Sequence, residues 1–106
     1  MARIAAIAPD LFFASKVKET LTAAGHDVTI VPPGGPVEAD LLIVDLDATG
    51  DDVTLPAGAP RLGFYSHVDV DTRKRAEASG FDLVVPRSRM AREMPALVER
   101  LLGSAD

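Results

Sequence analysis

The sequence predicts an α/β protein built on a five-stranded parallel sheet. Short apolar segments alternate with longer segments of helical periodicity, and Gly or Pro residues separate them. The segment "DLLIVDL" (40–46) is apolar at odd and even positions alike, a pattern typical of a parallel strand that is covered on both faces. A chain of 106 residues closes one core. We therefore expect a single domain over residues 1–103, followed by a short tail at 104–106.

The predicted strands are short apolar segments bounded by turn residues. They are residues 3–8, 26–31, 40–46, 61–66 and 81–86. Pro9-Asp10 ends the first strand, and "PPGGP" ends the second, whose β-branched Val28 and Ile30 favour extended backbone. Residues 48–60 contain too many Gly, Pro and Asp residues for a helix. The fourth strand should therefore follow the third without a full helix between them.

About three helices are predicted, each from apolar residues at helical spacing or from a polar segment between capping residues. They are residues 11–25, 69–80 and part of 88–103. Asp10 should cap the first helix and Gly25 should end it, while Asp69 and Gly80 should bound the second. Pro95 disfavours a helix interior. We therefore expect a loose turn to about residue 93, with Pro95 in the first turn of the last helix.

Composition excludes several classes of function. The formal charge of −5 disfavours binding to nucleic acid or to anionic membranes. The chain has no cysteine, and its two histidines lie far apart in the sequence, so no disulfide or metal motif is present. Neither a signal peptide nor a membrane span is evident. We expect a cytoplasmic protein without cofactor.

The order of these segments resembles the receiver domain of bacterial response regulators over nearly the whole chain. The matching landmarks are "RIAAIAPD", "AAGHDV", "ADLLIVDLD", Ser66 after the fourth strand, "EASGFDLVV" and Arg87 after the fifth. The resemblance implies a flavodoxin-like three-layer sandwich with strand order 2-1-3-4-5. It also implies that Asp45 stands where the family has its phosphoacceptor, and Ser66 where it has a hydroxyl.

The chain departs from that family at the residues that carry its chemistry. The family's pair of metal-binding acids falls on Ala8 and Pro9, which leaves only Asp10 one place late. Arg87 replaces the family's lysine, and Ser88 stands where a proline is expected. Phosphoryl transfer needs a metal to neutralise charge, and carboxylates to hold that metal. We therefore expect a pseudo-receiver: a non-catalytic regulatory or protein-binding module without a metal site.

Three interpretations of the carboxyl edge of the sheet remain open. Asp45 and Arg87 could form a structural ion pair, because a guanidinium can bind a partly buried carboxylate through two hydrogen bonds. Asp45 could instead be the phosphoacceptor of an atypical receiver. In the third interpretation, a small anionic ligand binds at this edge to Ser66, His67, Arg87, Ser88 and Arg89.

A homodimer is also predicted, because two connections are too short or too broken for a covering helix. "VPPGGPVEA" links the second and third strands, and "ATGDDVTLPAGAP" links the third and fourth. One face of the sheet should then be thinly covered, with Leu41 and Ile43 or Leu42 and Val44 at its centre. We expect a two-fold partner copy to cover it. The alternative is that the loops bury it.

Overall fold

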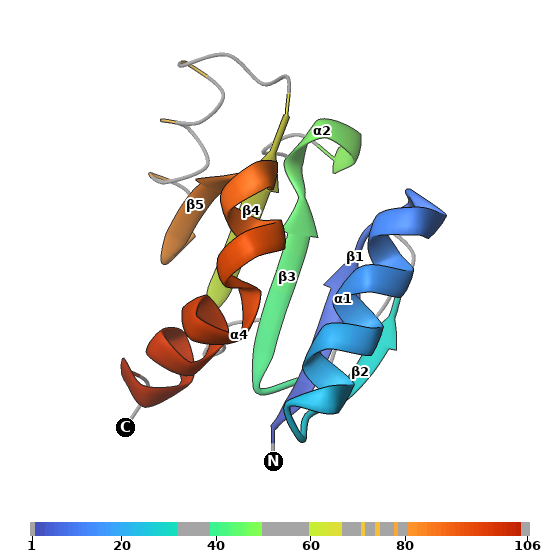
Figure 1. Cartoon of the computed structure of the whole chain (residues 1–106). Coiled ribbons are helices and arrows are strands. Elements are labelled where there is room, and N and C mark those ends of the chain that lie inside the picture. Colours follow the sequence, from blue (N-terminus) through green and yellow to red (C-terminus); the bar gives the residue numbers. More distant parts are fainter. Residues whose placement is uncertain are drawn as a thin grey trace.

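The computed structural model describes residues 2–31, 39–49, 60–66, 71, 74, 78 and 81–104. Its five strands form one parallel sheet in the order β2-β1-β3-β4-β5 (Figure 1). The strands are β1 (Arg3–Ile7), β2 (Asp27–Ile30), β3 (Leu41–Asp45), β4 (Arg61–Tyr65) and β5 (Leu83–Pro86). The predicted fold class and strand order are confirmed, with strand ends that differ by one or two residues.

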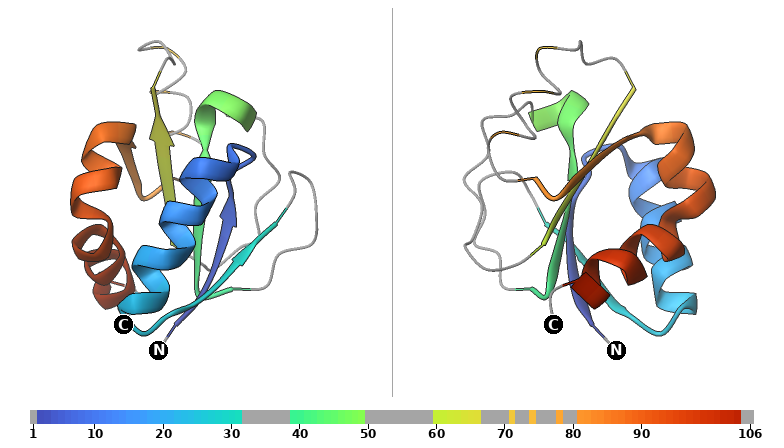
Figure 2. Two further views of the ribbon diagram at one scale, coloured as in Figure 1. Left: turned by 45° about the vertical axis from the view of Figure 1, so that its right-hand side comes forward. Right: turned by 90° about the vertical axis from the view of Figure 1, so that its left-hand side faces the viewer.

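Helices α1 (Leu11–Ala23) and α4 (Arg87–Ser104) lie on the same face of the sheet (Figure 2). Asp10 caps α1 as predicted, since its side chain accepts hydrogen bonds from the N–H groups of Phe12 and Phe13. Gly25 follows the end of α1 with a φ of 96°. That left-handed backbone favours glycine and confirms the predicted stop.

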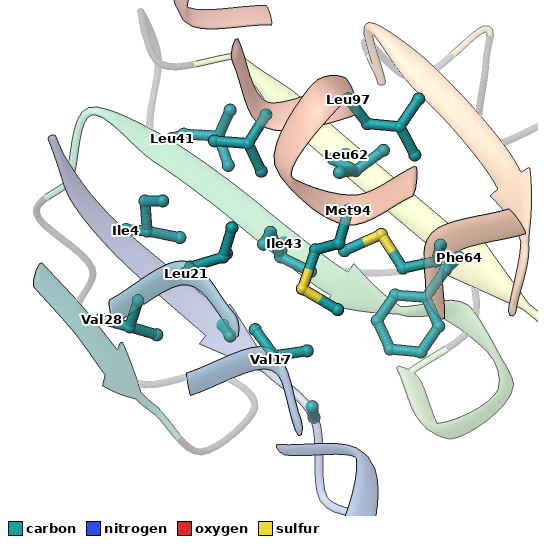
Figure 3. Close-up of a cluster of buried hydrophobic side chains, with 14 of the residues drawn as sticks. Ile4, Val17, Leu21, Val28, Leu41, Ile43, Leu62, Phe64, Met94 and Leu97 are labelled. Atoms are coloured by element: carbon teal, nitrogen blue, oxygen red, sulfur yellow. The ribbon is translucent and has the colours of Figure 1, made fainter. Parts of the chain in front are cut away.

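One apolar cluster fills the space between these two helices and the sheet (Figure 3). The sheet contributes alternate residues, among them Ile4, Leu41, Ile43, Leu62 and Phe64. The helices contribute residues at helical spacing, including Val17, Leu21, Met90, Met94, Leu97 and Val98. All of these side chains are buried. This cluster contains the larger part of the core that the structure describes.

A second cluster covers the opposite face of the sheet. Its members are Ala5, Ile7, Leu42, Val44, Leu46 and Phe81. Gly63 on β4 makes room for it, because a Cβ atom there would lie 3.1 Å from Leu46 Cδ1 and 3.1 Å from Phe81 Cδ2. Leu46 begins the one-turn helix α2 (Leu46–Thr49), which the sequence did not predict.

Burial of β3 differs from the expectation of a thinly covered face. Leu41, Leu42, Ile43 and Val44 are all 0% exposed in the single chain. Leu41 and Ile43 belong to the apolar cluster under α1 and α4, here called the α1/α4 cluster. Leu42 and Val44 belong to the second cluster, which contains Phe81. In the single chain these four side chains are therefore buried and do not form an exposed surface. The homodimer stays a prediction.

Helix α4 begins directly after β5, so the predicted loose turn before residue 93 is wrong. Pro95 lies inside the helix and is exposed to solvent. An interior proline costs about 3 kcal/mol relative to alanine. Met90 and Met94 are both 0% exposed, and burying each such side chain contributes about 1.5–3 kcal/mol. Burial of the apolar stripe therefore outweighs the cost of the proline inside α4.

The described part of the predicted helix 69–80 is limited to Asp71, Lys74 and Ala78, which are helical and exposed. The remainder of that prediction lies outside the described residues. Within the part of the chain that the structure covers, no helix is long and apolar enough to cross a membrane.

His26 connects three segments of the chain at the amino edge of the sheet. The side chain is buried, and its Nδ1 accepts a hydrogen bond of 3.3 Å from the N–H of Ala2. Its Nε2 lies 3.0 Å from Oε1 of Glu99 on α4. Because Nδ1 is the acceptor, Nε2 carries the proton and donates to Glu99. The imidazole thus ties the start of β1 and the α1–β2 turn to α4.

Candidate functional site

The carboxyl ends of the strands bring the predicted site residues to one edge of the sheet. Asp10 follows β1, Asp45 ends β3, Ser66 follows β4, and Arg87 begins α4 directly after β5. Parallel pairing aligns these ends: Ile7 is opposite Val44, and Asp45 is opposite Phe64. This is the edge where open parallel sheets carry their ligands.

Arg87 forms an ion pair with Asp10, and not with Asp45 as in one of the three interpretations. Its Nη2 lies 2.6 Å from Oδ2 of Asp10, and its Cζ lies 4.4 Å from the centre of the Phe13 ring. Phe13 in turn packs against Phe64, with ring centres 4.7 Å apart. Asp10 is the N-cap residue of α1, and Phe13 lies in the first turn of that helix. The guanidinium is therefore drawn toward α1 by a carboxylate and an aromatic face together.

The Asp10 carboxylate is held in its charged form. The hydrogen bond from Arg87 is the largest cause that lowers the pKa of Asp10, and the hydrogen bond from the N–H of Phe13 lowers it further. One side chain thus caps a helix and binds a cation. Both carboxylate oxygens of Asp10 therefore accept hydrogen bonds from within the protein.

Asp45 is buried, with 4% of its surface exposed. Its Oδ1 accepts a hydrogen bond of 3.0 Å from the N–H of Asp47, which directs the chain into α2. Asp47 Oδ2 in turn accepts a hydrogen bond of 2.7 Å from the N–H of Ser66. Two carboxylates therefore join the end of β3 to the end of β4 through backbone N–H groups.

The positions of the resembled family's acid pair carry no side chain here that could be a metal ligand. Ala8 is 2% exposed and belongs to the α1/α4 apolar cluster, while Pro9 is exposed and has no ligand group. Among the described residues, no group of three His, Asp or Glu side chains is placed to hold a metal ion.

The structure divides the predicted site residues into two sets. Asp10 and Arg87 form one contact, and Asp45 joins a second one with Asp47 and Ser66. Ser88 lies exposed in the first turn of α4. His67 lies outside the described residues, so the prediction that it helps to bind an anion stays a prediction.

Sequence reasoning missed Asp47 and the role of Phe13. Asp47 follows Asp45 by two residues in "DLD", and a second carboxylate just past a strand is a signal that could have been used. The stacking of Arg87 on Phe13 joins residues 74 positions apart. No local pattern could have indicated it.

Comparison with solved structures finds the same fold in receiver domains. A CheY-like receiver domain protein from Methanospirillum hungatei JF-1 has a TM-score of 0.80 at 14% identity, covering 99% of this chain and 96% of that one. The receiver domain of Francisella response regulator 1452 has a TM-score of 0.78 at 13% identity, with both chains fully covered. NtrX from Brucella abortus, in complex with ADP, has a TM-score of 0.79 at 16% identity; the match covers 98% of this chain but 26% of NtrX.

These likenesses show that the chain has the receiver fold, as the resemblance predicted. No protein-family model matches the chain, and a search of curated proteins finds no relative.

Proposed function

We propose that this chain is a receiver-like regulatory module that acts by binding protein partners and not by accepting a phosphoryl group. The proposal rests on the residues that follow β1. Where receivers of the resembled type place a metal-binding acid pair, this chain has a buried alanine and a proline. Asp10, the acid that remains, is bonded to Arg87 and to the first turn of α1.

The chemistry of phosphoryl transfer supports this proposal. Charge develops on the transferring group, and enzymes and receivers of this kind neutralise it with a magnesium ion. Magnesium is anchored through carboxylates and takes six oxygen ligands in a strict octahedral geometry. Asp45 is buried and bonded to the N–H of Asp47, so it would have to anchor a metal without help from the end of β1. We infer that Asp45 has a structural role, directing the chain from β3 into α2.

The proposal is tested by phosphorylation with a small-molecule donor. The full chain is incubated with acetyl phosphate and magnesium, and its intact mass is measured. We expect the mass to stay unchanged. Asp45→Asn and Asp47→Asn are the matched variants, because each removes one carboxylate from the same edge.

A stoichiometric gain of one phosphoryl group would contradict the proposal if it disappears in Asp45→Asn and persists in Asp47→Asn. That result would favour the atypical receiver, in which Asp45 accepts phosphate. As a second readout, beryllofluoride with magnesium should leave the backbone amide NMR signals around Asp45 unshifted.

A further inference from the structure

The outer side of α1 carries a narrow stripe of four exposed residues. Phe12, Lys16, Glu19 and Ala23 are spaced i, i+4, i+7 and i+11, so they lie along one side of the helix. Phe12 is 91% exposed, the highest value among the exposed large apolar residues in the part of the chain that the structure describes. The opposite side of the helix is buried through Phe13, Ala14, Val17 and Leu21. The stripe therefore faces away from the apolar cluster that α1 buries against the sheet, on which α1 lies in Figure 1.

We propose that this stripe is a self-recognition surface, on which a second copy of the chain docks with its α1 antiparallel across a two-fold axis. The axis would pass midway between Lys16 and Glu19. In that arrangement, Phe12 meets Ala23 of the other copy, and Lys16 meets Glu19 of the other copy. The symmetry repeats each contact, as in any isologous interface.

Size and charge both match in this pairing. A large exposed side chain at one end of α1 is placed over a small one at the other end, so the two helices can approach closely. Opposite charges are placed in register, and each of the two ion pairs would be lost if either residue changed sign. Leu11, which is 80% exposed, lies beside Phe12 and extends the apolar end of the stripe. Two-fold complementarity of this kind selects a second copy over an unrelated partner.

The area available limits the strength of the association. Helix α1 has 13 residues and is therefore about 20 Å long. One helix pair of that length is below the standard size of a stable interface, which buries about 1,600 Å² in total. We expect a weak dimer in the high micromolar range. The inference goes beyond the proposed function, because it involves neither Asp45 nor phosphate.

Sedimentation equilibrium of the full chain, from micromolar to millimolar concentration, tests the proposal. Phe12→Ser should abolish the dimer. Lys16→Glu and Glu19→Lys should each weaken it by about tenfold, because each places two like-charge pairs across the axis. The double variant Lys16→Glu/Glu19→Lys restores both pairs in reverse and should bring dimerisation back to the wild-type range.

Lys18→Glu is the matched control. It makes the same charge change as Lys16→Glu at an exposed position of α1 outside the stripe, and it should leave dimerisation close to wild type. Circular dichroism checks that each variant is folded. A monomer at millimolar concentration would overturn the proposal, and so would a double variant as weak as its singles. Equal effects of Lys16→Glu and Lys18→Glu would also overturn it, because net charge alone would then explain the loss.

Discussion

Removing the Glu99 carboxylate, which accepts the hydrogen bond from His26, should lower the free energy of unfolding measurably. Replacing it with a neutral acceptor should largely preserve that free energy. The His26 side chain is 7% exposed, and Glu99 is 65% exposed. In Glu99→Ala the Nε2–H group is left nearly buried without its protein acceptor, which costs about 1–3 kcal/mol. Water can reach the space that the exposed Glu99 side chain leaves, so we expect the lower end, about 1 kcal/mol. Glu99→Gln keeps an oxygen at the same place and should cost less than about 0.5 kcal/mol.

Urea unfolding followed by circular dichroism gives both values, and thermal unfolding provides a second measure. A loss of 1 kcal/mol corresponds to a fall of about 4 °C in Tm for a domain of this size. Ala96→Gly, at an exposed site on the same helix, is a control for helix propensity. Equal losses for Glu99→Ala and Glu99→Gln would refute the reasoning, because the hydrogen bond to His26 would then contribute nothing.

Three further results are expected, each from one described contact. The pKa of Asp10 is lowered chiefly by the hydrogen bond from Arg87. The charged Asp10 carboxylate therefore stabilises the fold above the ordinary carboxyl pKa range, and this stabilisation is lost as the pH falls through the folded-state pKa. Asp10→Asn should accordingly flatten the acid side of a curve of unfolding free energy against pH. Gly63→Val should cost about 1–3 kcal/mol in urea unfolding, because its Cβ would already crowd Phe81, and an unchanged midpoint would contradict that packing. Pro95→Ala should raise the free energy of unfolding by about 1–2 kcal/mol. This is less than the about 3 kcal/mol that proline costs in a helix interior, because proline also restricts the unfolded chain. A destabilised variant would show that the proline fits α4 without cost.

The sequence indicated the strands well because burial on both faces leaves a local signature. All apolar residues of "RIAAIA" and "DLLIVDL" are buried, and Asp45 is the one charged residue of these two segments that is buried with them. The same signature cannot tell what covers a strand. The sequence leaves open whether Leu41 and Ile43 or Leu42 and Val44 lie on a thinly covered face, whereas in the structure Leu42 and Val44 pack in one cluster with Phe81, which is distant in the sequence.

The candidate site was predicted less well than the fold, for a different reason. Strand ends placed Asp10, Asp45 and Arg87 at one edge, but the choice of ion-pair partner depends on side-chain direction. Phe13 offers Arg87 an aromatic face beside Asp10, and that preference arises only after α1 has packed on the sheet. Tertiary contacts of this kind decide between partners that sequence spacing leaves equivalent.

Because α4 follows all five strands along the chain, the ribosome makes the whole sheet before the helix that covers part of one face. Met90, Met94, Leu97, Val98 and Leu101 all come from this helix. Until they emerge, the apolar side chains of β3 and β4 on that face remain open to water and to other nascent chains. Such exposure is what chaperones recognise and what drives aggregation. Chains that terminate before α4 should therefore be cleared or aggregate, and should not accumulate as a folded half.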